Sequence, residues 1–213
     1  DRTFPGSEIE INLTRREVFS PRPHQQEAIS KAIAGFETHD RGKLIMACGT
    51  GKTFTALRLA EQYAENNGGR ARVLFLVPSI SLLSQTLKEW TAQNQEHLPL
   101  KSYAVCSDTK VSKKAEDIAS YDLEVPVSTN GKDIAERTAQ GKRRKGLNVV
   151  FSTYQSIKAI HEAQTLGMDD FDLVICDEAH RTTGVTLAGE DASNFVRIHD
   201  ADYILSLIHI SEP

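Results

Sequence analysis

The stretch "LIMACGTGKT", Leu44 to Thr53, decides the fold of this chain. It follows the order of a G-x-x-x-x-G-K-[ST] phosphate-binding loop, except that Met46 stands where the first glycine is expected. Gly49 and Gly51 lack a Cβ and tolerate positive φ, so the backbone can approach a phosphate closely there. An apolar strand before the loop, a helix N-terminus after it and Lys52 complete an anion site. Position 46 is expected to belong still to the strand, so a glycine is not required there.

Short apolar runs alternate with amphipathic segments along the whole chain. Strands are predicted at "KLIMA", "RVLFLVP", "SYAVC", "LNVVFS" and "FDLVIC". Helices are predicted after "PRPHQQ", from Lys52 to about Asn66, along Leu83, Leu87 and Trp90, at Asp133–Ala139, and from Tyr154 onward. This alternation is typical of βα units, and we expect one α/β domain with a mostly parallel central sheet flanked by helices.

Composition restricts the setting and the partners. The 213 residues carry a formal net charge of -4, so contact with nucleic acid has to come from local basic clusters. Cys48, Cys106 and Cys176 lie far apart without C-x-x-C spacing, which argues against a zinc site or a disulfide framework and favours a reducing, cytoplasmic setting. No apolar run approaches the ~18 residues of a membrane span, so we expect no membrane partner.

A second motif, "FDLVICDEAH", places Asp177 and Glu178 at the carboxyl end of a buried strand, where α/β sheets present ligand-binding groups. With ATP in the loop, Lys52 would contact the β and γ phosphates, and Thr53 and Asp177 would hold Mg²⁺. Glu178 would orient and deprotonate the attacking water. Acidic residues at strand ends are also common as caps. The assignment of this acidic pair to a nucleotide site therefore depends on the phosphate loop upstream.

Together, "ACGTGKT", "CDEAH" and "RPHQQEAI" resemble motifs I and II and the glutamine motif of superfamily 2 helicases and DNA translocases, whose loop also lacks the first glycine. "LVPSISLLSQ" is similar to motif Ia, and "VFSTYQSI" to the T-x-Y-Q-S motif that precedes the acidic box. The resemblance runs from Arg22 to Ile204 and implies a P-loop NTPase domain, the first of two RecA-like lobes. In detail it looks closest to the motors of restriction-modification enzymes, including single polypeptides that join nuclease, translocase and methyltransferase.

The resemblance also implies roles for single residues. Arg22, His24 and Gln25 would recognise adenine, and the phosphates would lie on Cys48, Gly49, Thr50, Gly51, Lys52 and Thr53. Ser79, Thr153, Tyr154 and Gln155 would face the nucleic-acid backbone without reading bases. His180 would join the acidic box to the next motif through a hydrogen bond.

Plainer roles remain open for several of these residues. Gln25 and Gln26 could both be exposed glutamines at a helix start, and Ser79 and Thr153 could cap the helices that follow them. His180 could be structural only. The basic run from Lys142 to Lys145 could touch DNA phosphate, but we favour a solvated loop.

Three regions are expected. Residues 1–20 would be a linker from a missing upstream region, and residues 21–204 the ATP-binding lobe. Leu205 to Pro213 can be spelled CTG TCT CTT ATA CAC ATC TCC GAG CCC, which looks like a sequencing-library transposon adapter, so we exclude residues 205–213 from fold reasoning. The alternative is a genuine strand, because "LSLIHI" has suitable residues for one.

The expected activity is hydrolysis of Mg-ATP coupled to movement along duplex DNA. The expected partners are DNA, a second RecA-like lobe, and nuclease and methyltransferase regions of the same chain. An RNA-directed helicase, or a nucleotide-binding module without turnover, are the alternatives.

Overall fold

The computed structural model describes residues 17–47, 49–106, 128–139, 145–177 and 203–210. Several predicted features lie outside these ranges, namely Cys48, Glu178, His180 and most of the basic run at 142–145. Among the described residues, no helix is long and apolar enough to cross a membrane.

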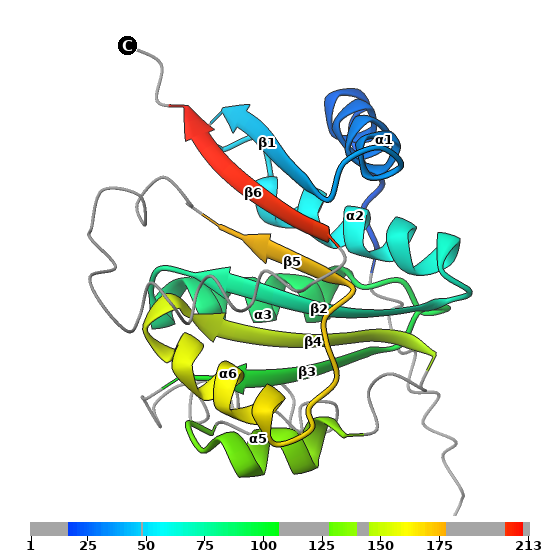
Figure 1. Cartoon of the computed structure of the whole chain (residues 1–213). Helices are drawn as coiled ribbons and strands as arrows, with labels where there is room; N and C mark the ends of the chain where they lie inside the picture. The colour runs from blue at the N-terminus through cyan, green and yellow to red at the C-terminus, as the bar shows by residue number, and fades with distance from the viewer. Residues whose placement is uncertain (1–16, 48, 107–127, 140–144, 178–202, 211–213) are drawn as a thin grey trace, which may run out of the picture.

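A six-stranded sheet forms the centre of the molecule, in the order β1-β6-β5-β2-β4-β3 (Figure 1). Each neighbouring pair of strands is parallel. The strands are β1 (Arg41–Ala47), β2 (Arg70–Val77), β3 (Leu100–Val105), β4 (Gly146–Thr153), β5 (Leu173–Cys176) and β6 (Tyr203–Ile210). The predicted α/β class with a parallel sheet is therefore confirmed.

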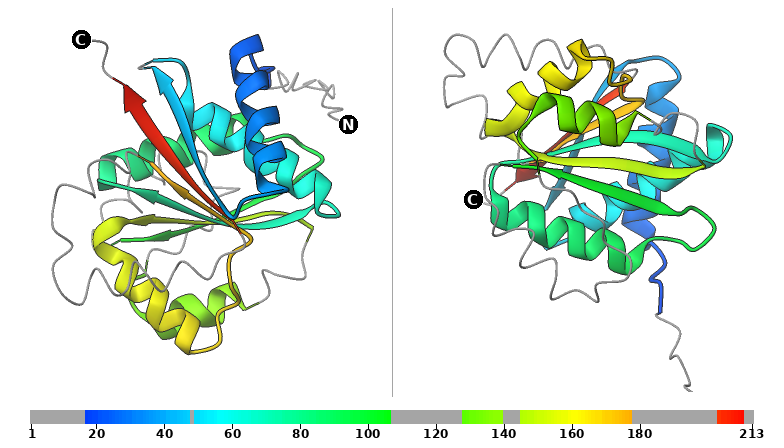
Figure 2. Two further views of the ribbon diagram at one scale, coloured as in Figure 1. Left: turned by 45° about the horizontal axis from the view of Figure 1, so that its top comes forward. Right: turned by 90° about the horizontal axis from the view of Figure 1, so that it is seen from below.

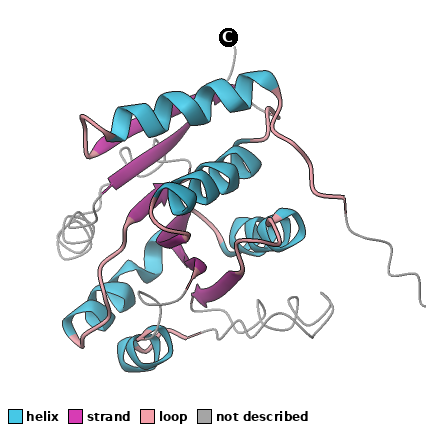
Figure 3. Ribbon diagram, turned by 90° about the vertical axis from the view of Figure 1, so that its right-hand side faces the viewer, coloured by secondary structure: helices cyan, strands magenta, loops and turns pink. Residues whose placement is uncertain are grey.

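Helices cover both faces of this sheet (Figures 2 and 3). One face carries α1 (Pro23–Phe36), α2 (Lys52–Asn66) and α3 (Ile80–Gln93). The other face carries α5 (Gly131–Thr138), the 3₁₀ turn η2 (Tyr154–Ser156) and α6 (Ile157–Thr165). A helix was predicted at each of these places, and the predicted starts at Lys52, Asp133 and Tyr154 lie within a few residues of the observed ones.

Two apolar layers hold the sheet and its helices together. On the face of α1 to α3, Trp90 packs edge-on against Phe75 and Phe151, with ring centroids 5.2 Å and 5.5 Å away. All three rings are fully buried. The opposite layer joins α5 and α6 to residues such as Leu74 and Val150. Because β2 and β4 are buried on both faces, the runs "VLFLV" and "VVF" at their centres are continuously apolar rather than alternating.

The helix after the phosphate loop begins and ends where the sequence predicted. Gly51 is its N-cap residue and has left-handed backbone angles. At the other end Gly68 and Gly69 both have positive φ, and the amide of Gly69 donates to the carbonyl of Ala64 at 2.8 Å. This bond closes the end of α2 and returns the chain into β2.

Strand β6 includes residues that we excluded from fold reasoning. It pairs with β1 from Arg41↔Ile204 to Ala47↔Ile210 and with β5 from Leu173↔Tyr203 to Cys176↔Ser206. The structure thus agrees with the alternative expectation, that "LSLIHI" forms a strand. A paired strand does not reveal the origin of its codons, because an apolar run can add to a sheet whatever its source.

Candidate nucleotide-binding site

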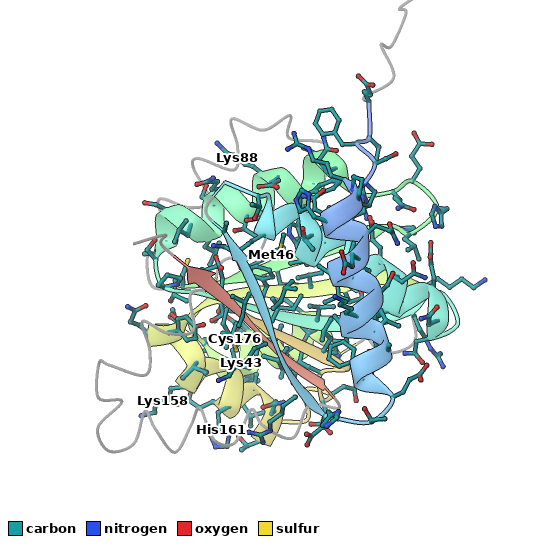
Figure 4. All side chains as sticks on the ribbon, turned by 90° about the horizontal axis from the view of Figure 1, so that it is seen from above. Lys43, Met46, Lys88, Lys158, His161 and Cys176 are labelled. Carbon is teal, nitrogen blue, oxygen red and sulfur yellow. The ribbon has the colours of Figure 1, made fainter. Side chains whose placement is uncertain are left out.

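The loop between β1 and α2 has the backbone that a phosphate site requires. Gly49 and Gly51 adopt φ of +70° and +79°, in the left-handed region that side chains rarely adopt. The hydroxyl of Thr50 donates to the carbonyl of Ala47 at 2.7 Å, which ties the loop to the end of β1. Met46 lies within β1 and is buried in the core (Figure 4), so the prediction that this position belongs to the strand is confirmed.

Lys52 and Thr53 are the first two residues of α2. Their side chains are half-buried at the carboxyl end of β1, where the free N–H groups and the dipole of the helix favour an anion. The carbonyl of Thr53 accepts a hydrogen bond from Nε1 of Trp90 at 3.1 Å. The first turn of α2 is therefore anchored to the buried core on the other side of the helix.

Gln25 packs directly on the phosphate loop. Its Nε2 donates to the carbonyl of Thr50 at 2.9 Å, and its Oε1 accepts from the amide of Arg22 at 2.9 Å. Gln25 is 5% exposed, whereas the next residue, Gln26, is exposed. The structure therefore brings Gln25, rather than Gln26, to the loop, and the alternative of an exposed helix-start glutamine does not hold for Gln25.

Both amide atoms of Gln25 keep some capacity for a ligand, since the oxygen has a second lone pair and the nitrogen a second hydrogen. His24 also approaches the loop, with Nε2 3.4 Å from the carbonyl of Thr50, and both His24 and Arg22 are exposed. Gln25 and His24 thus adjoin the loop, and Arg22 is the N-cap residue of the same helix, α1.

Asp177 directly follows β5, and β6 alone separates β5 from β1. Because these strands are parallel, Asp177 and the phosphate loop lie at the same edge of the sheet. The Asp177 amide donates to the carbonyl of Leu76 at 2.8 Å, and its carbonyl accepts from the Tyr154 hydroxyl at 2.9 Å. The loop that carries Lys52 and Thr53 therefore lies at the same edge as Asp177, but β5 ends level with Lys43, four residues before β1 ends at Ala47.

Cys176, the last residue of β5, is not a candidate nucleophile. Burial raises the pKa of its thiol to about 12, and the hydrogen bond with the Tyr154 side chain lowers it only in part. The thiol is thus un-ionised at neutral pH, which leaves it unreactive.

The four residues predicted to face nucleic acid have different surroundings. Oγ of Ser79 accepts from the amide of Leu82 at 3.3 Å, so this residue caps α3. Thr153 and Tyr154 are buried, at 3% and 7% exposed, and Gln155 is exposed. Nucleic-acid contact stays a prediction, and burial argues against direct contact by Thr153 and Tyr154.

The Thr153 hydroxyl does not cap the helix that follows it. It donates to the hydroxyl of Ser156 at 3.1 Å instead of accepting from a helical amide. The capping alternative is therefore confirmed for Ser79 and wrong for Thr153.

Two buried charges near the site escaped the sequence analysis. Arg58 and Glu61, on α2, form an ion pair whose side chains are 4% and 1% exposed. A signal was present, because opposite charges three positions apart stand within the mostly apolar run "FTALRLAE". Their partners could not be foreseen, since Arg58 also binds carbonyls 39 and 35 positions away in the chain.

Comparisons with known proteins agree on one family. The model of the family described as "Type III restriction enzyme, res subunit" matches residues 18–207. A "Probable helicase" of African swine fever virus is 31% identical over 169 residues, which are 79% of this chain and 17% of the viral protein.

Two solved structures are similar in fold and sequence. A nuclease-deletion mutant of the Type ISP restriction-modification enzyme LlaGI, in complex with a DNA substrate mimic, is 36% identical with a TM-score of 0.72, and the match covers 92% of this chain and 18% of that one. The ATP-dependent Type ISP enzyme LlaBIII bound to DNA is 38% identical with a TM-score of 0.74, covering 90% of this chain and 13% of that one.

The chain thus spans less than a fifth of the length of these relatives. The family match, in contrast, takes in the phosphate loop, Asp177 and every described strand and helix, apart from the last residues of β6. The chain belongs to the family of the Type III restriction enzyme res subunit.

Proposed function

We propose that this chain is the first RecA-like, ATP-binding lobe of an ATP-dependent DNA translocase or helicase in a restriction-modification enzyme. One observation carries the proposal: a positive-φ glycine loop and a helix N-terminus share one sheet edge with Asp177. The family supports it, as does the likeness to Type ISP enzymes whose structures contain DNA or a DNA mimic.

The residues at this edge fit Mg-ATP. When bound, Mg-ATP supplies the γ-phosphate that water attacks in line. Lys52 and the amides at the start of α2 hold the phosphates, and the Thr53 hydroxyl and Asp177 carboxylate are the hard oxygen ligands that Mg²⁺ prefers. Arg22, His24 and Gln25 hold the adenine.

Three further roles rest on the family alone. Glu178 activates the attacking water as a general base. His180 connects the acidic box to the next motif. Ser79 and Gln155, whose side chains are not buried, face the nucleic-acid backbone.

The partners belong to the same proposal. Duplex DNA is the track, and a second RecA-like lobe, a nuclease and a methyltransferase belong to the same polypeptide. Residues 21–204 form the lobe itself.

The decisive test is Lys52→Ala in the complete protein. We expect loss of Mg-ATP binding or turnover, because the substitution removes the loop cation that faces the phosphates. Turnover is measured as phosphate release with and without duplex DNA. The control is Lys88→Ala, because Lys88 lies on the exposed side of α3 (Figure 4).

Each alternative has its own outcome in this assay. Normal turnover by Lys52→Ala would overturn the site. Stimulation by RNA and not by DNA would identify an RNA-directed helicase. Tight nucleotide binding without turnover in the wild-type protein would identify a binding module.

A further inference from the structure

The segment that enters the lobe, residues 17–22 (the entry segment), is held by its backbone. It runs past the C-terminal end of α3 before α1 begins (Figure 2). The Phe19 amide donates to Oε1 of Gln93 at 2.9 Å, and the Phe19 carbonyl accepts from Nη2 of Arg58 at 2.9 Å. The Phe19 side chain is 59% exposed. The contact is therefore made by the main chain, while the ring faces solvent.

Arg58 and Glu61 join three parts of the chain in one buried cluster. Arg58 pairs with Glu61 through Nη1, and its Nη2 also donates to the carbonyl of Gln93, the last residue of α3, at 3.0 Å. Oε1 of Glu61 accepts from Nδ2 of Asn94 at 3.2 Å and from the amide of Gln95 at 2.8 Å. The planar guanidinium thus fixes α2, the end of α3 and the entry segment relative to one another.

The entry segment is stiff between this cluster and the phosphate loop. Pro21 and Pro23 fix their own φ and hold the preceding residues extended, as the φ of -68° and ψ of 159° at Arg22 show. Two residues after Pro23, Gln25 donates to the loop. A segment with so few free dihedral angles transmits the position of Phe19 to Gln25.

The contact at the loop end is tight. A Cβ on Gly51 would lie 2.7 Å from Nε2 of Gln25, so the amide of Gln25 fits closely over a glycine. The Thr55 hydroxyl donates to the Gly51 carbonyl at 2.9 Å, which joins this glycine to the second turn of α2. The contacts that lead from Arg58 through the entry segment to the phosphate loop therefore end on α2, the helix that also carries Arg58.

We propose that Arg58 and Glu61 form a clamp that positions the phosphate loop through the entry segment and Gln25. They are positioning residues, because neither lies at the loop. The inference deepens the proposed function, since the loop that they position is the one assigned to ATP. It also gives the chain upstream of residue 17 a mechanical link to the nucleotide site.

The test is amide hydrogen exchange of the full 213-residue chain, followed in peptides that cover residues 17–25 and 44–55. Arg58→Lys keeps the positive charge but loses the branched guanidinium that makes several hydrogen bonds at once. Gln93→Ala removes only the acceptor of the Phe19 amide. We expect both variants to speed exchange in the entry segment by about tenfold, and exchange in the loop as well. Gln25→Ala should speed exchange in the loop alone.

A double variant and a matched control complete the design. Arg58→Lys combined with Gln25→Ala should exchange in the loop no faster than Gln25→Ala, because the clamp acts through Gln25. The control is Arg72→Lys, which alters the other buried arginine, on β2, whose partners are Asp169 and the Thr138 carbonyl. It should leave both peptides unchanged.

Affinity for nucleotide gives a second readout. Arg58→Lys should weaken ATP and GTP binding by the same factor, about threefold to tenfold, because loop geometry is common to both. Three outcomes would each refute the clamp. Arg58→Lys could leave exchange in the entry segment unchanged, or it could speed exchange in the entry segment but not in the loop. In the third outcome, the effects of Arg58→Lys and Gln25→Ala on loop exchange would add in the double variant. Failure of the complete wild-type protein to bind Mg-ATP would refute the proposed function only, since the exchange measurements need no nucleotide.

Discussion

Arg58 and Glu61 are the charges that α2 removes almost entirely from water. Arg58→Ala would leave the carboxylate of Glu61 buried without its cation, and we expect a loss of about 3–5 kcal/mol in the free energy of unfolding. The double change Arg58→Met with Glu61→Leu removes both charges and should cost less. Urea unfolding followed by the fluorescence of Trp90, the single tryptophan, measures both. Equal losses in the two variants would show that packing, not the unpaired charge, sets the cost.

Single residues divide into those that a motif identifies and those that only the fold reveals. Lys52, Thr53 and Asp177 could be predicted, because their chemistry requires fixed spacing next to a strand end. Gln25 could be placed near the loop by family resemblance, but its bond to the Thr50 carbonyl could not, since the two residues are 25 positions apart. Hydrogen bonds between residues so far apart in the chain do not produce a periodic pattern from which they could be predicted.

At the scale of elements, apolar periodicity was sufficient for most of the fold. The strand "RARVLFLV" is buried at all but its first position, and Leu83, Leu87 and Trp90 all lie on the buried face of α3. The strand order could not be read from such patterns, because pairing depends on crossovers between elements. Residues 205–210 of the strand Tyr203–Ile210 were left out because they can be spelled as an adapter sequence, and a match of that kind carries no information about pairing.

The turn from β1 into α2 offers a prediction at this scale. Gly51→Ala should destabilise the chain by more than the ~1–2 kcal/mol expected for a left-handed non-glycine residue, because the new Cβ would also meet Gln25 at 2.7 Å. Gly49→Ala is the matched control, since Gly49 has φ of +70° and no atom within 4 Å of a Cβ. Urea unfolding compares the two.

Removal of the Gln25 side chain separates the cost of a left-handed backbone at residue 51 from the cost of the contact between the new Cβ and Gln25. Gly51→Ala combined with Gln25→Ala should be less destabilised than the sum of the two single changes, because the double variant has no amide to displace. If Gly51→Ala and Gly49→Ala cost the same, Gln25 does not limit the size of residue 51.

For the whole molecule, we propose that Leu205 to Pro213 are absent from the natural gene. Long-read resequencing should find other codons after Ile204, because residues 205–213 can be spelled with codons that match an adapter sequence. The pairing of β6 with β1 and β5 is compatible with this outcome, as an apolar run can pair there. Codons for these nine residues that continue into a second RecA-like lobe would refute the proposal.

The last prediction concerns what one lobe can do alone. The motors that this chain resembles place ATP between two lobes, and the second supplies arginines that stabilise charge on the γ-phosphate, an effect typically worth ~10³–10⁵ in rate in nucleotide hydrolases. Residues 1–213 should therefore bind Mg-ATP weakly, hydrolyse it negligibly and show no stimulation by DNA, because stimulation requires two lobes to close. Phosphate release with and without duplex DNA, compared with a chain that includes the second lobe, measures this. A DNA-stimulated rate of order 1 s⁻¹ from this chain alone would mean that its own residues complete the site.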